Sequence, residues 1–421
     1  MTQPDFNEIC AREAERIFAD VFALSRSEGG RRGVTRLGYT AAEDAVMAYL
    51  TEEGRRLGLE IETDPAGNVW MTLPGENRTL PALAAGSHTD SVLDGGNYDG
   101  LAGICAALAP VWWLRAQGKK LRRDYRVLLI RSEEQGLIGT TGILGELKSE
   151  DLERRFIEGG PTLGEALAAH GIDPAPLMGG EPLIDLGGIA AFFEAHIEQR
   201  DVLDRSPDLR VGIVTGIRGV RVHRRIAAKG VTAHAGAVEY AERHDAVAAC
   251  ARFISRMYDH WTRAVARGED LVFTTGGIRT PDTAIFNKIS GECEMTLDMR
   301  SLDQATFDRF SALIDRELAD IALEMGVAFE ADPPVLLPCN RCDAALMQRL
   351  HKAAESLGTG VREMASGATH DAANFGGAGV PYAMLFIANQ NGSHNPDEAM
   401  RTDDFVAAAA VMTRAIEQFD A

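Results

Sequence analysis

The fold of the chain can be worked out starting from residues 80–117, LPALAAGSHTDSVLDGGNYDGLAGICAALAPVWWLRAQ. The apolar first part predicts a buried strand, the glycine-rich middle predicts a loop, and 101–117 predicts a helix. His88 ends the strand, Asp90 follows on the same side of an extended backbone, and Asp99 precedes the helix. Imidazole and carboxylate groups are typical metal ligands, although an isolated HxD is more often an ordinary polar loop.

Three further segments place similar side chains at the ends of apolar runs. YRVLLIRSEEQ (125–135) ends in Glu133 and Glu134, FFEAHIEQ contains His196, and the loop NGSHNP contains His394. Because the carboxyl ends of parallel strands meet at one sheet edge, these side chains are expected to lie close together. Adjacent acids on a surface are usually just solvated. At the end of so apolar a strand, however, one can bind metal while the other acts as a general base.

The predicted metal site rests on the accumulation of these residues, because no single motif is decisive. A ligating histidine commonly needs a carboxylate to orient its other ring nitrogen, and Asp90 suits that role for His88. Asp99 is placed to bridge two metals. Zinc, manganese, cobalt or nickel would each fit histidine and carboxylate ligands, so the identity of the metal stays open.

Strands alternate with helices through most of the chain, which predicts an α/β fold with a mostly parallel sheet. Helices are expected at 5–25 and 40–58, the second capped by Thr40. This alternation continues up to about Val214 and resumes after Pro338.

Between those points the order of elements changes. A strand at 216–231, which alternates as if one face met solvent, is followed by a helix, two strands, a helix and a strand. That order is typical of a ferredoxin-like unit. We therefore predict an inserted domain at 217–332 within a catalytic domain formed by 1–216 and 333–421.

The composition favours a soluble globular enzyme. With 45% apolar and 25% charged residues, the 421-residue chain can form a sizeable core, and its formal net charge of -19 disfavours nucleic acids and anionic membranes. The N-terminal twenty residues show no signal-peptide pattern, and no apolar run has membrane-spanning length. The six cysteines are scattered and form a single CxxC, which predicts reduced thiols and a cytoplasmic location.

A series of motifs resembles the M20 metallopeptidase clan: HTDSVLDGGNYDG, SEEQG, HIEQ, HAG, NKISGE, LDMR, SGATHDA and SHNP. The resemblance spans about residues 35 to 410 and is closest to the branch of N-carbamoyl-L-amino-acid hydrolases, ureidopropionases and allantoate amidohydrolases. It implies two divalent metal ions per subunit. It also implies cleavage, by metal-activated water, of a C–N bond in a carboxylate-bearing carbamoyl or N-acyl amino acid. The inserted domain is implied to be a dimerisation or lid domain.

Residue by residue, the resemblance implies metal ligands, a general base and an orienting acid. The ligands correspond to His88, Asp99, Glu134, His196 and His394, with Asp99 shared by both ions. Glu133 corresponds to the general base, and Asp90 to the acid that orients His88.

The inserted domain is implied to supply groups that act on the substrate. His234 corresponds to a residue that polarises the scissile carbonyl, and a charge-assisted donor there would stabilise the developing oxyanion. Asn287 and Arg300 correspond to a clamp for the substrate carboxylate, which a planar guanidinium suits well. The resemblance also implies a homodimer, in which His234 and Asn287 can serve the neighbouring subunit's site.

Three more residues are candidates for substrate contacts. Gln199 corresponds to a substrate-contacting glutamine of the family. The segment SGATHDA offers Ser366 and His370 as polar contacts. For Ser366, a role as the N-cap of a following helix is an equally good expectation.

The chain departs from the family pattern at three places. Gln135 follows the acid pair where SEEGSRFG is usual, Arg200 replaces the glycine of HIEQG, and Glu239 stands in HAGAVEY where HAGTTPM is usual. None of these positions is a predicted ligand. All lie where the substrate side chain or leaving group is expected, so they bear on the substrate.

Several other functions fit parts of the sequence. Within the same chemistry, the alternatives are an allantoate-type ureido hydrolase, an aminoacylase or dipeptidase, and an aminohydrolase acting on an amino-substituted carboxylic acid. A catalytically silent binding protein would have lost a ligand or the base, and none is lost here. A nucleotide-binding protein is disfavoured because DGGNYDGLAG is not GxGxxG and no P-loop lysine follows.

Overall fold

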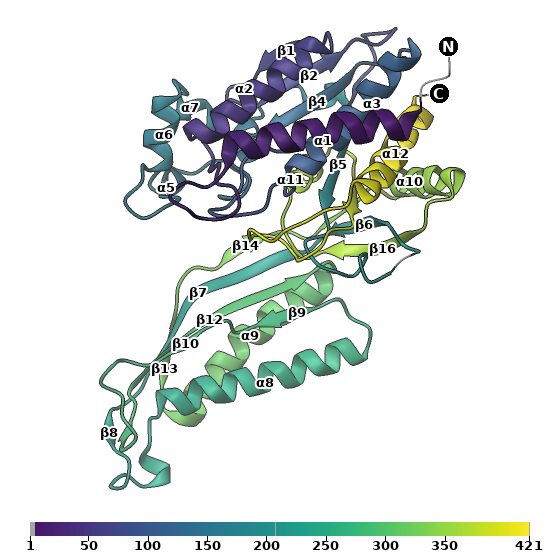
Figure 1. Cartoon of the computed structure of the whole chain (residues 1–421). Helices are drawn as coiled ribbons and strands as arrows, with labels where there is room; N and C mark the ends of the chain where they lie inside the picture. The colour runs from purple at the N-terminus through teal and green to yellow at the C-terminus, as the bar shows by residue number, and fades with distance from the viewer. Residues whose placement is uncertain (1–4, 207, 421) are drawn as a thin grey trace. The chain divides into compact units, whose positions relative to one another are not determined.

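The computed structural model describes residues 5–206 and 208–420 of the chain. The chain divides into two compact units (Figure 1). The first comprises the chain up to Thr215, Cys342–Met364 and everything from Thr369 onward, and the second comprises Gly216–Arg341 and Ala365–Ala368. The second unit extends past residue 332, because β14 (Val335–Leu337) pairs with β7 (Gly219–Lys229).

The larger sheet has a parallel centre and antiparallel edges. Its strand order is β1-β2-β4-β3-β5-β17-β6-β15, with β16 paired to β6. The neighbours β4, β3, β5 and β17 run parallel, which confirms the predicted α/β fold with a mostly parallel central sheet. The bounds are β1 (Glu60–Thr63), β2 (Val69–Leu73), β3 (Ala82–His88), β4 (Tyr125–Ile130), β5 (Ile189–Ile197), β6 (Val211–Ile217), β15 (Asn340–Arg341), β16 (Val361–Ser366) and β17 (Tyr382–Ile387).

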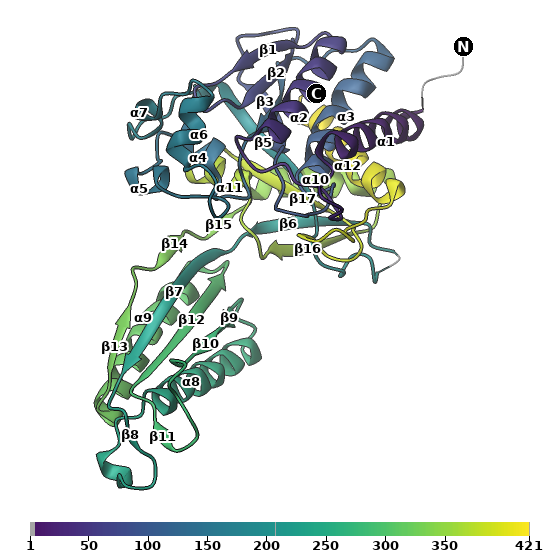
Figure 2. The ribbon, with the colours of Figure 1, turned by 60° about the vertical axis from the view of Figure 1, so that its left-hand side comes forward.

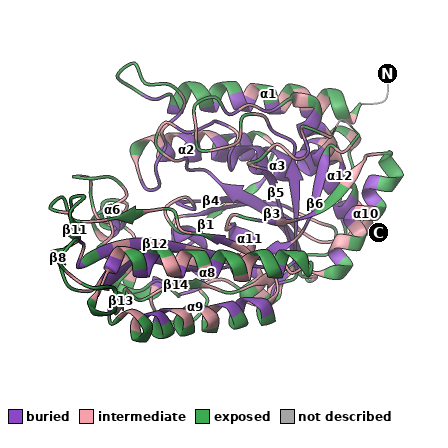
Figure 3. Ribbon diagram, turned by 90° about the horizontal axis from the view of Figure 1, so that it is seen from below, coloured by how far each residue is buried: buried purple, intermediate pink, exposed green. Residues whose placement is uncertain are grey.

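Helices cover both faces of this sheet, which explains why its central strands are apolar throughout (Figures 2 and 3). Successive side chains alternate between the faces: Phe193 joins the core beneath α3, whereas Phe192 stacks on Phe375 of α11 with ring centroids 4.1 Å apart. One face carries α1 (Phe6–Ser25), α2 (Ala41–Arg56), α3 (Leu101–Gln117), α10 (Ala344–Leu357) and α12 (Thr402–Phe419). The other carries α4 (Ile138–Ile143) and α11 (Asp371–Gly377).

Two local features differ from the sequence-based expectations. Thr40 occupies the N-cap position of α2, but its hydroxyl donates to the carbonyl of Leu37 instead of accepting from the helix. The segment after α4, for which no elements were predicted, forms the short elements α5 (Ser149–Leu152), α6 (Leu163–Ala169), α7 (Pro174–Leu177) and η1 (Leu186–Gly188). Helices of this length contain too few turns to produce a periodic apolar pattern.

The second unit has one antiparallel sheet of order β10-β12-β7-β13, in which β14 also pairs with β7 and β9 with β12, and α8 and α9 pack on it. Its strands β13, β7, β12 and β9 are therefore neighbours in that order. This is the order expected for a ferredoxin-like unit. The bounds are β7, α8 (Ala246–Ala266), β9 (Val272–Thr274), β10 (Ile278–Arg279), β12 (Glu292–Ser301), α9 (Gln304–Met325), β13 (Ala328–Ala331) and β14, and a separate ladder joins β8 (Ala233–His234) to β11 (Lys288–Ile289) near η2 (Tyr240–Glu242).

The first strand of this unit, β7, was expected to expose one face. Arg224 and Arg225 are exposed, but Arg221 and His223 are buried. The two buried side chains hydrogen-bond each other, and each also bonds a neighbouring segment through Asp315 or Asp332. Burial of these polar groups is therefore compensated by partners that the strand pattern alone does not indicate.

Two observations concern the whole described chain. Within residues 5–206 and 208–420, no helix combines the length and apolar character needed to cross a bilayer. All six cysteines are free thiols, and five of them are buried.

Candidate metal centre

The predicted ligands come from five separate segments of the first unit. His88 is the last residue of β3, and His196 lies near the end of the neighbouring β5. Asp99 immediately precedes Gly100, the N-cap residue of α3. Glu134 follows β4, and His394 follows β17. The carboxyl ends of four adjacent parallel strands thus deliver these side chains to one edge of the sheet.

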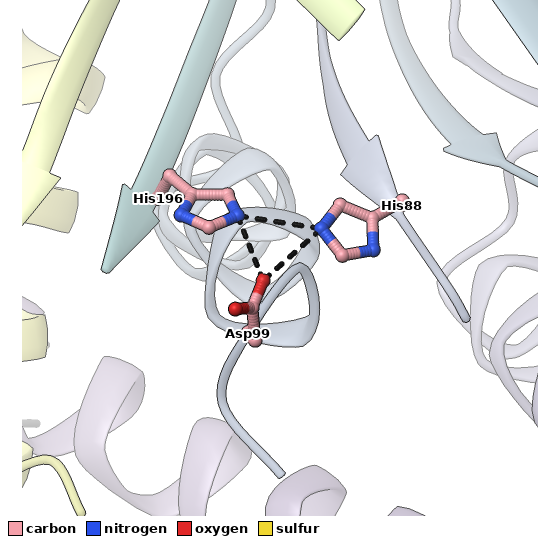
Figure 4. A group of neighbouring side chains, drawn as sticks. All are labelled: His88, Asp99 and His196. Carbon is pink, nitrogen blue, oxygen red and sulfur yellow. Dashed lines mark hydrogen bonds and ion pairs between the residues drawn. The ribbon is translucent and has the colours of Figure 1, made fainter. Parts of the chain in front are cut away.

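His88, Asp99 and His196 form the first group, which is fully buried (Figure 4). Oδ1 of Asp99 lies 3.2 Å from Nε2 of His88 and 3.0 Å from Nε2 of His196. The two ring nitrogens are 3.3 Å apart. Two imidazole nitrogens and one carboxylate oxygen therefore converge on a common point, as the ligands of a cation would.

Gly100 permits this arrangement. Its φ of +72° is unfavourable for residues with a side chain, and an added Cβ would lie 2.5 Å from both Nδ1 and the carbonyl oxygen of His88. The backbone at the start of α3 can therefore approach His88 only because residue 100 has no side chain.

Asp99, Glu134 and His394 form the second group, which is partly exposed. Nε2 of His394 lies 3.3 Å from Oε2 of Glu134 and 3.6 Å from Oδ2 of Asp99. Asp99 thus presents one carboxylate oxygen to each group. His394 has a φ of +59°, a left-handed conformation uncommon for residues other than glycine.

Asp90 contacts both His88, at the end of β3, and the turn that carries Glu133 and Glu134. Its carbonyl oxygen lies 3.2 Å, and its Oδ1 3.4 Å, from Nδ1 of His88, the ring nitrogen that does not face Asp99. Its two carboxylate oxygens also accept hydrogen bonds from the amide nitrogens of Glu133 and Glu134, at 2.9 and 3.1 Å. Asp90 is fully buried, so it fixes both the ring of His88 and the turn that carries the two glutamates.

The electrostatics favour added positive charge at the centre. Burial lowers the pKa of His88, but Glu133, Asp90 and Asp99 outweigh it and raise that pKa well above its ordinary value. Burial raises the pKa of Asp99, but His196 and His88 outweigh it and hold that pKa well below its ordinary value. Hydrogen bonding to Glu134 raises the pKa of His394 to about 9. The buried carboxylates thus recruit protons onto the neighbouring imidazoles.

The residues present fit a pair of divalent metal ions. Oε1 of Glu134 is buried without a hydrogen-bond partner, which is costly unless another group contacts it. The donor set combines imidazole nitrogens with carboxylate oxygens, which suits zinc, manganese, cobalt or nickel. Within the described residues, these two groups are the ones with metal-binding geometry.

Gln199 and His370 also lie beside the first group. Nε2 of Gln199 donates to Oδ2 of Asp99 at 3.0 Å, from a backbone with a φ of +63°. The ring of His370 is buried 4.5 Å from that of His196, measured between centroids. Burial and the adjacent His196 hold the pKa of His370 well below its ordinary value.

Ser366, His234, Asn287 and Arg300 belong to the second unit. Ser366 ends β16, and His370 occupies the N-cap position of α11, so the alternative expectation that Ser366 caps this helix is wrong. His234 lies in β8, and Asn287 immediately precedes β11, which pairs with β8. Both residues are exposed. The guanidinium of Arg300 binds both carboxylate oxygens of Asp298, at 2.8 and 2.7 Å, and also the carbonyl of Gly367.

The three departures from the family pattern have different surroundings. Oε1 of Gln135 accepts hydrogen bonds from the amide of Gly38 and the hydroxyl of Ser132, each at 3.0 Å, so this side chain joins two loops. Arg200 is exposed and approaches Glu198 at 3.7 Å. Glu239 is exposed on the second unit.

Sequence reasoning missed three residues around the predicted ligands. Ser393 donates to Oδ2 of Asp99 and to Glu398, which in turn accepts from the amide of Asp99 at 3.2 Å. Both belong to NGSHNPDE, so their proximity to His394 was the available signal. Arg36 donates to the carbonyl of Asp99 at 3.4 Å, and nothing in GVTRLGYT marks it.

Comparison with known proteins places these observations in a family. Residues 72–418 match the family described as Peptidase family M20/M25/M40. The N-carbamoyl-L-amino acid amidohydrolase of Geobacillus stearothermophilus is 32% identical over 96% of this chain and 98% of its own length. The allantoate amidohydrolase of Escherichia coli (strain K12) is 30% identical over 91% of this chain and 92% of its own.

A solved structure gives the same result. A hydantoinase/carbamoylase family amidase from Burkholderia ambifaria superposes with a TM-score of 0.83 and 27% identity, over 98% of both chains. The predicted resemblance to the amidase branch is confirmed, as is the predicted enzyme class, a hydrolase of non-peptide C–N bonds. The chain belongs to Peptidase family M20/M25/M40.

Proposed function

We propose that the protein is a metal-dependent amidohydrolase that cleaves a C–N bond in a small, carboxylate-bearing carbamoyl or N-acyl amino acid. The observation that carries this proposal is the convergence of ligand-type side chains into two groups that share Asp99. The names of relatives aligned over more than nine-tenths of the chain support the class of substrate.

The residues have distinct tasks in this proposal. His88, His196 and Asp99 would hold one ion, and Glu134, His394 and Asp99 the other. When bound, the ions supply Lewis-acid polarisation of the scissile carbonyl and of a water molecule. The carboxylate of Glu133 takes a proton from the attacking water and delivers it to the leaving nitrogen. Asp90 orients His88 and, through two amide hydrogen bonds, the turn that carries Glu133.

Residues of the second unit would bind the substrate, as the family resemblance implies. His234 donates a hydrogen bond to the developing oxyanion, while Asn287 and Arg300 bind the substrate carboxylate. Because Arg300 already pairs with Asp298, binding exchanges one carboxylate partner for another. That exchange favours substrates with a full negative charge over neutral amides. Gln199, Ser366 and His370 add polar contacts.

We further propose that the active form is a homodimer in which His234 and Asn287 serve the neighbouring subunit, and that the enzyme works in the cytoplasm. Both residues are exposed, as groups that act across an interface must be in the isolated chain. Sedimentation velocity gives the assembly state. A monomeric sedimentation coefficient at full turnover would contradict the shared site.

A panel of substrates tests the proposed function. Metal-stripped protein is assayed for ammonia or amine release with and without manganese on N-carbamoyl-L-amino acids, allantoate, N-acyl amino acids and aromatic amino acids. We expect manganese-dependent turnover of a carbamoyl amino acid. Activity confined to allantoate, to the acyl compounds or to the free amino acids would instead identify the allantoate hydrolase, the aminoacylase or the aminohydrolase.

One substitution separates the base from the ligands. Glu133→Gln should lower turnover by about 10²- to 10⁴-fold, the usual range for loss of a general base, while metal content stays unchanged. The exposed Glu158 provides a matched control, since Glu158→Gln alters no contact of the site. Equal activity of both variants would rule out Glu133 as the base.

A further inference from the structure

A fully buried arginine lies behind the loop that carries Asp99. The side chain of Arg36 has no exposed surface. Its Nε donates to the carbonyl of Thr89 at 2.7 Å, and its Nη2 donates to the carbonyls of Asn97 and Asp99, each at 3.4 Å. Its Nη1 reaches the side chains of Ser25 and Asn97, each at 3.4 Å. Arg36 thus joins both ends of the loop from Thr89 to Asp99.

The hydrogen-bond partners of this guanidinium are neutral carbonyl, hydroxyl and amide groups. Among the described residues, no carboxylate pairs directly with Arg36, although burying an unpaired cation forfeits its hydration. Burial lowers the pKa of Arg36, and the acids that oppose this shift are led by Asp90 and Glu398. The cation therefore acts at slightly longer range on the acids of the metal centre.

A buried glutamate holds the same segment from its amide side. Oε1 of Glu398 accepts hydrogen bonds from the amides of Tyr98 and Asp99, at 2.8 and 3.2 Å. Its Oε2 accepts from Ser393, whose hydroxyl also contacts Asp99. A Cβ at Gly96 would lie 2.0 Å from the carboxyl carbon of Glu398, so only glycine there lets the carboxylate approach the loop.

We propose that Arg36 and Glu398 are positioning residues that together fix Asp99 for both metal ions. Arg36 binds carbonyl groups of residues 97–99, and Glu398 binds amide groups of the same segment. The two side chains thus hold one stretch of backbone through different atoms, an arrangement that we call the Asp99 clamp. The inference rests on the metal centre of the proposed function, since Asp99 belongs to both ligand groups.

A charged residue at position 36 can affect the electrostatics of the metal centre as well as its geometry. Asp90, Asp99, Glu133 and Glu134 lie together, and a positive charge within the fold adds to that of the neighbouring imidazoles in reducing their mutual repulsion. Arg36 supplies a permanent positive charge from within the fold, because a guanidinium stays protonated. Glu398 accepts hydrogen bonds from the amides of Tyr98 and Asp99 and so orients the peptide next to Asp99. The ligand geometry is then set before metal binds.

Metal affinity tests the clamp independently of catalysis. Arg36→Met, Arg36→Lys and Glu398→Gln are prepared as full-length, metal-stripped protein, and zinc and manganese affinity is measured by competition with a chromophoric chelator. We expect affinity about 10- to 100-fold weaker for Arg36→Met and Glu398→Gln, as is usual when a group that orients a ligand is lost. Arg36→Lys keeps the positive charge but loses the forked hydrogen bonds. Its metal affinity should therefore lie between those of wild type and Arg36→Met.

A matched arginine distinguishes positioning from general stability. Arg123 is also mostly buried and bonds to Asp420, but it precedes β4 at the opposite end of that strand from Glu133. Arg123→Met should lower the melting temperature and leave metal affinity unchanged. The visible absorption of the cobalt-loaded proteins adds a second readout: the clamp variants should shift the d–d bands, whereas Arg123→Met should not.

The outcomes separate the clamp from the proposed function. If Arg36→Met and Glu398→Gln bind metal as tightly as wild type while melting earlier, the clamp is overturned and the metal centre stands. If wild type binds neither metal, both are overturned. The double variant Arg36→Met/Glu398→Gln should lose less affinity than the sum of the single losses, and additive losses would overturn joint action. Should Arg36→Met fail to fold, Arg36→Lys and Glu398→Gln carry the same test.

Discussion

The two ligand groups that share Asp99 differ in burial and in the backbone that carries them. His88 and His196 lie on paired strands and are 1% exposed, whereas the side chain of His394 is 51% exposed in a loop. Glu134 also lies in a turn, two residues after Ser132 with its φ of +55°. The first group is therefore held by the sheet, and the second by loops in uncommon conformations.

This contrast indicates unequal tasks for the two groups. Attraction between ligand and cation is stronger where water is excluded, and strand-borne ligands lose little freedom on binding. The buried group is thus suited to retain an ion, and the exposed group to exchange one and admit substrate. Asp99 couples the groups because its two carboxylate oxygens face opposite sides.

Loss of Asp99 should have the largest effect, because it removes a ligand from both groups. Asp99→Ala should lower turnover by at least about 10³-fold, since the metal supplies several kcal/mol and each 1.4 kcal/mol is tenfold. Metal analysis after dialysis should find less than one ion per chain. Asp94→Ala, in the same loop but partly exposed, is the control and should change turnover by less than about tenfold. Two bound ions in Asp99→Ala would refute the shared ligand.

Substitution of one histidine from each group tests their inequality directly. His394→Ala should retain about one ion per chain through dialysis against a weak chelator, because the buried group is intact. His196→Ala should retain less metal, because it removes a ligand from the buried group and leaves the exposed group as the only complete one of the two. The metal content per chain of the two variants is measured by atomic emission spectroscopy after dialysis. The reverse order would show that burial does not set retention here.

The candidate ligands could be proposed from the sequence because most of them follow a local pattern. His88, Glu134 and His394 come after apolar runs, and an apolar run that ends in a polar group predicts the edge of a buried strand. Parallel topology then brings those edges together. The family resemblance supplied the pairing of ligands and the roles on the second unit, which no local pattern indicates.

The residues behind the ligands could not be predicted in the same way. Glu398 and Asp99 are 299 positions apart and meet only through tertiary structure. Arg36 resembles any surface arginine in a loop until its burial is known. For the same reason the hydrogen bonds of Gln135 to Gly38 and Ser132 were not anticipated, and Gln135 had been assigned a place near the substrate side chain.

Two glycines with positive φ, at the two ends of α3, allow a test of the backbone around the buried group. Gly118→Ala, after the end of α3, adds a Cβ that meets nothing within 4 Å, so only backbone strain of about 1–2 kcal/mol is expected. Gly100→Ala adds the clash with His88, about 1–3 kcal/mol more, and should also weaken metal binding. Urea unfolding and metal titration measure both effects. Equal metal affinity in the two variants would mean that the approach of α3 to His88 is not needed.

The smallest effect on stability is expected at Arg200, beside Gln199. Its side chain is 54% exposed, and its Nε lies 3.7 Å from Oε1 of Glu198. Arg200→Gly should therefore change the free energy of unfolding by no more than about 0.5–1 kcal/mol. If Arg200 faces the substrate, KM for a substrate with an acidic side chain should rise more than KM for one with an apolar side chain, with kcat little changed. Equal changes in both KM values would mean that this departure from the family pattern does not select the substrate.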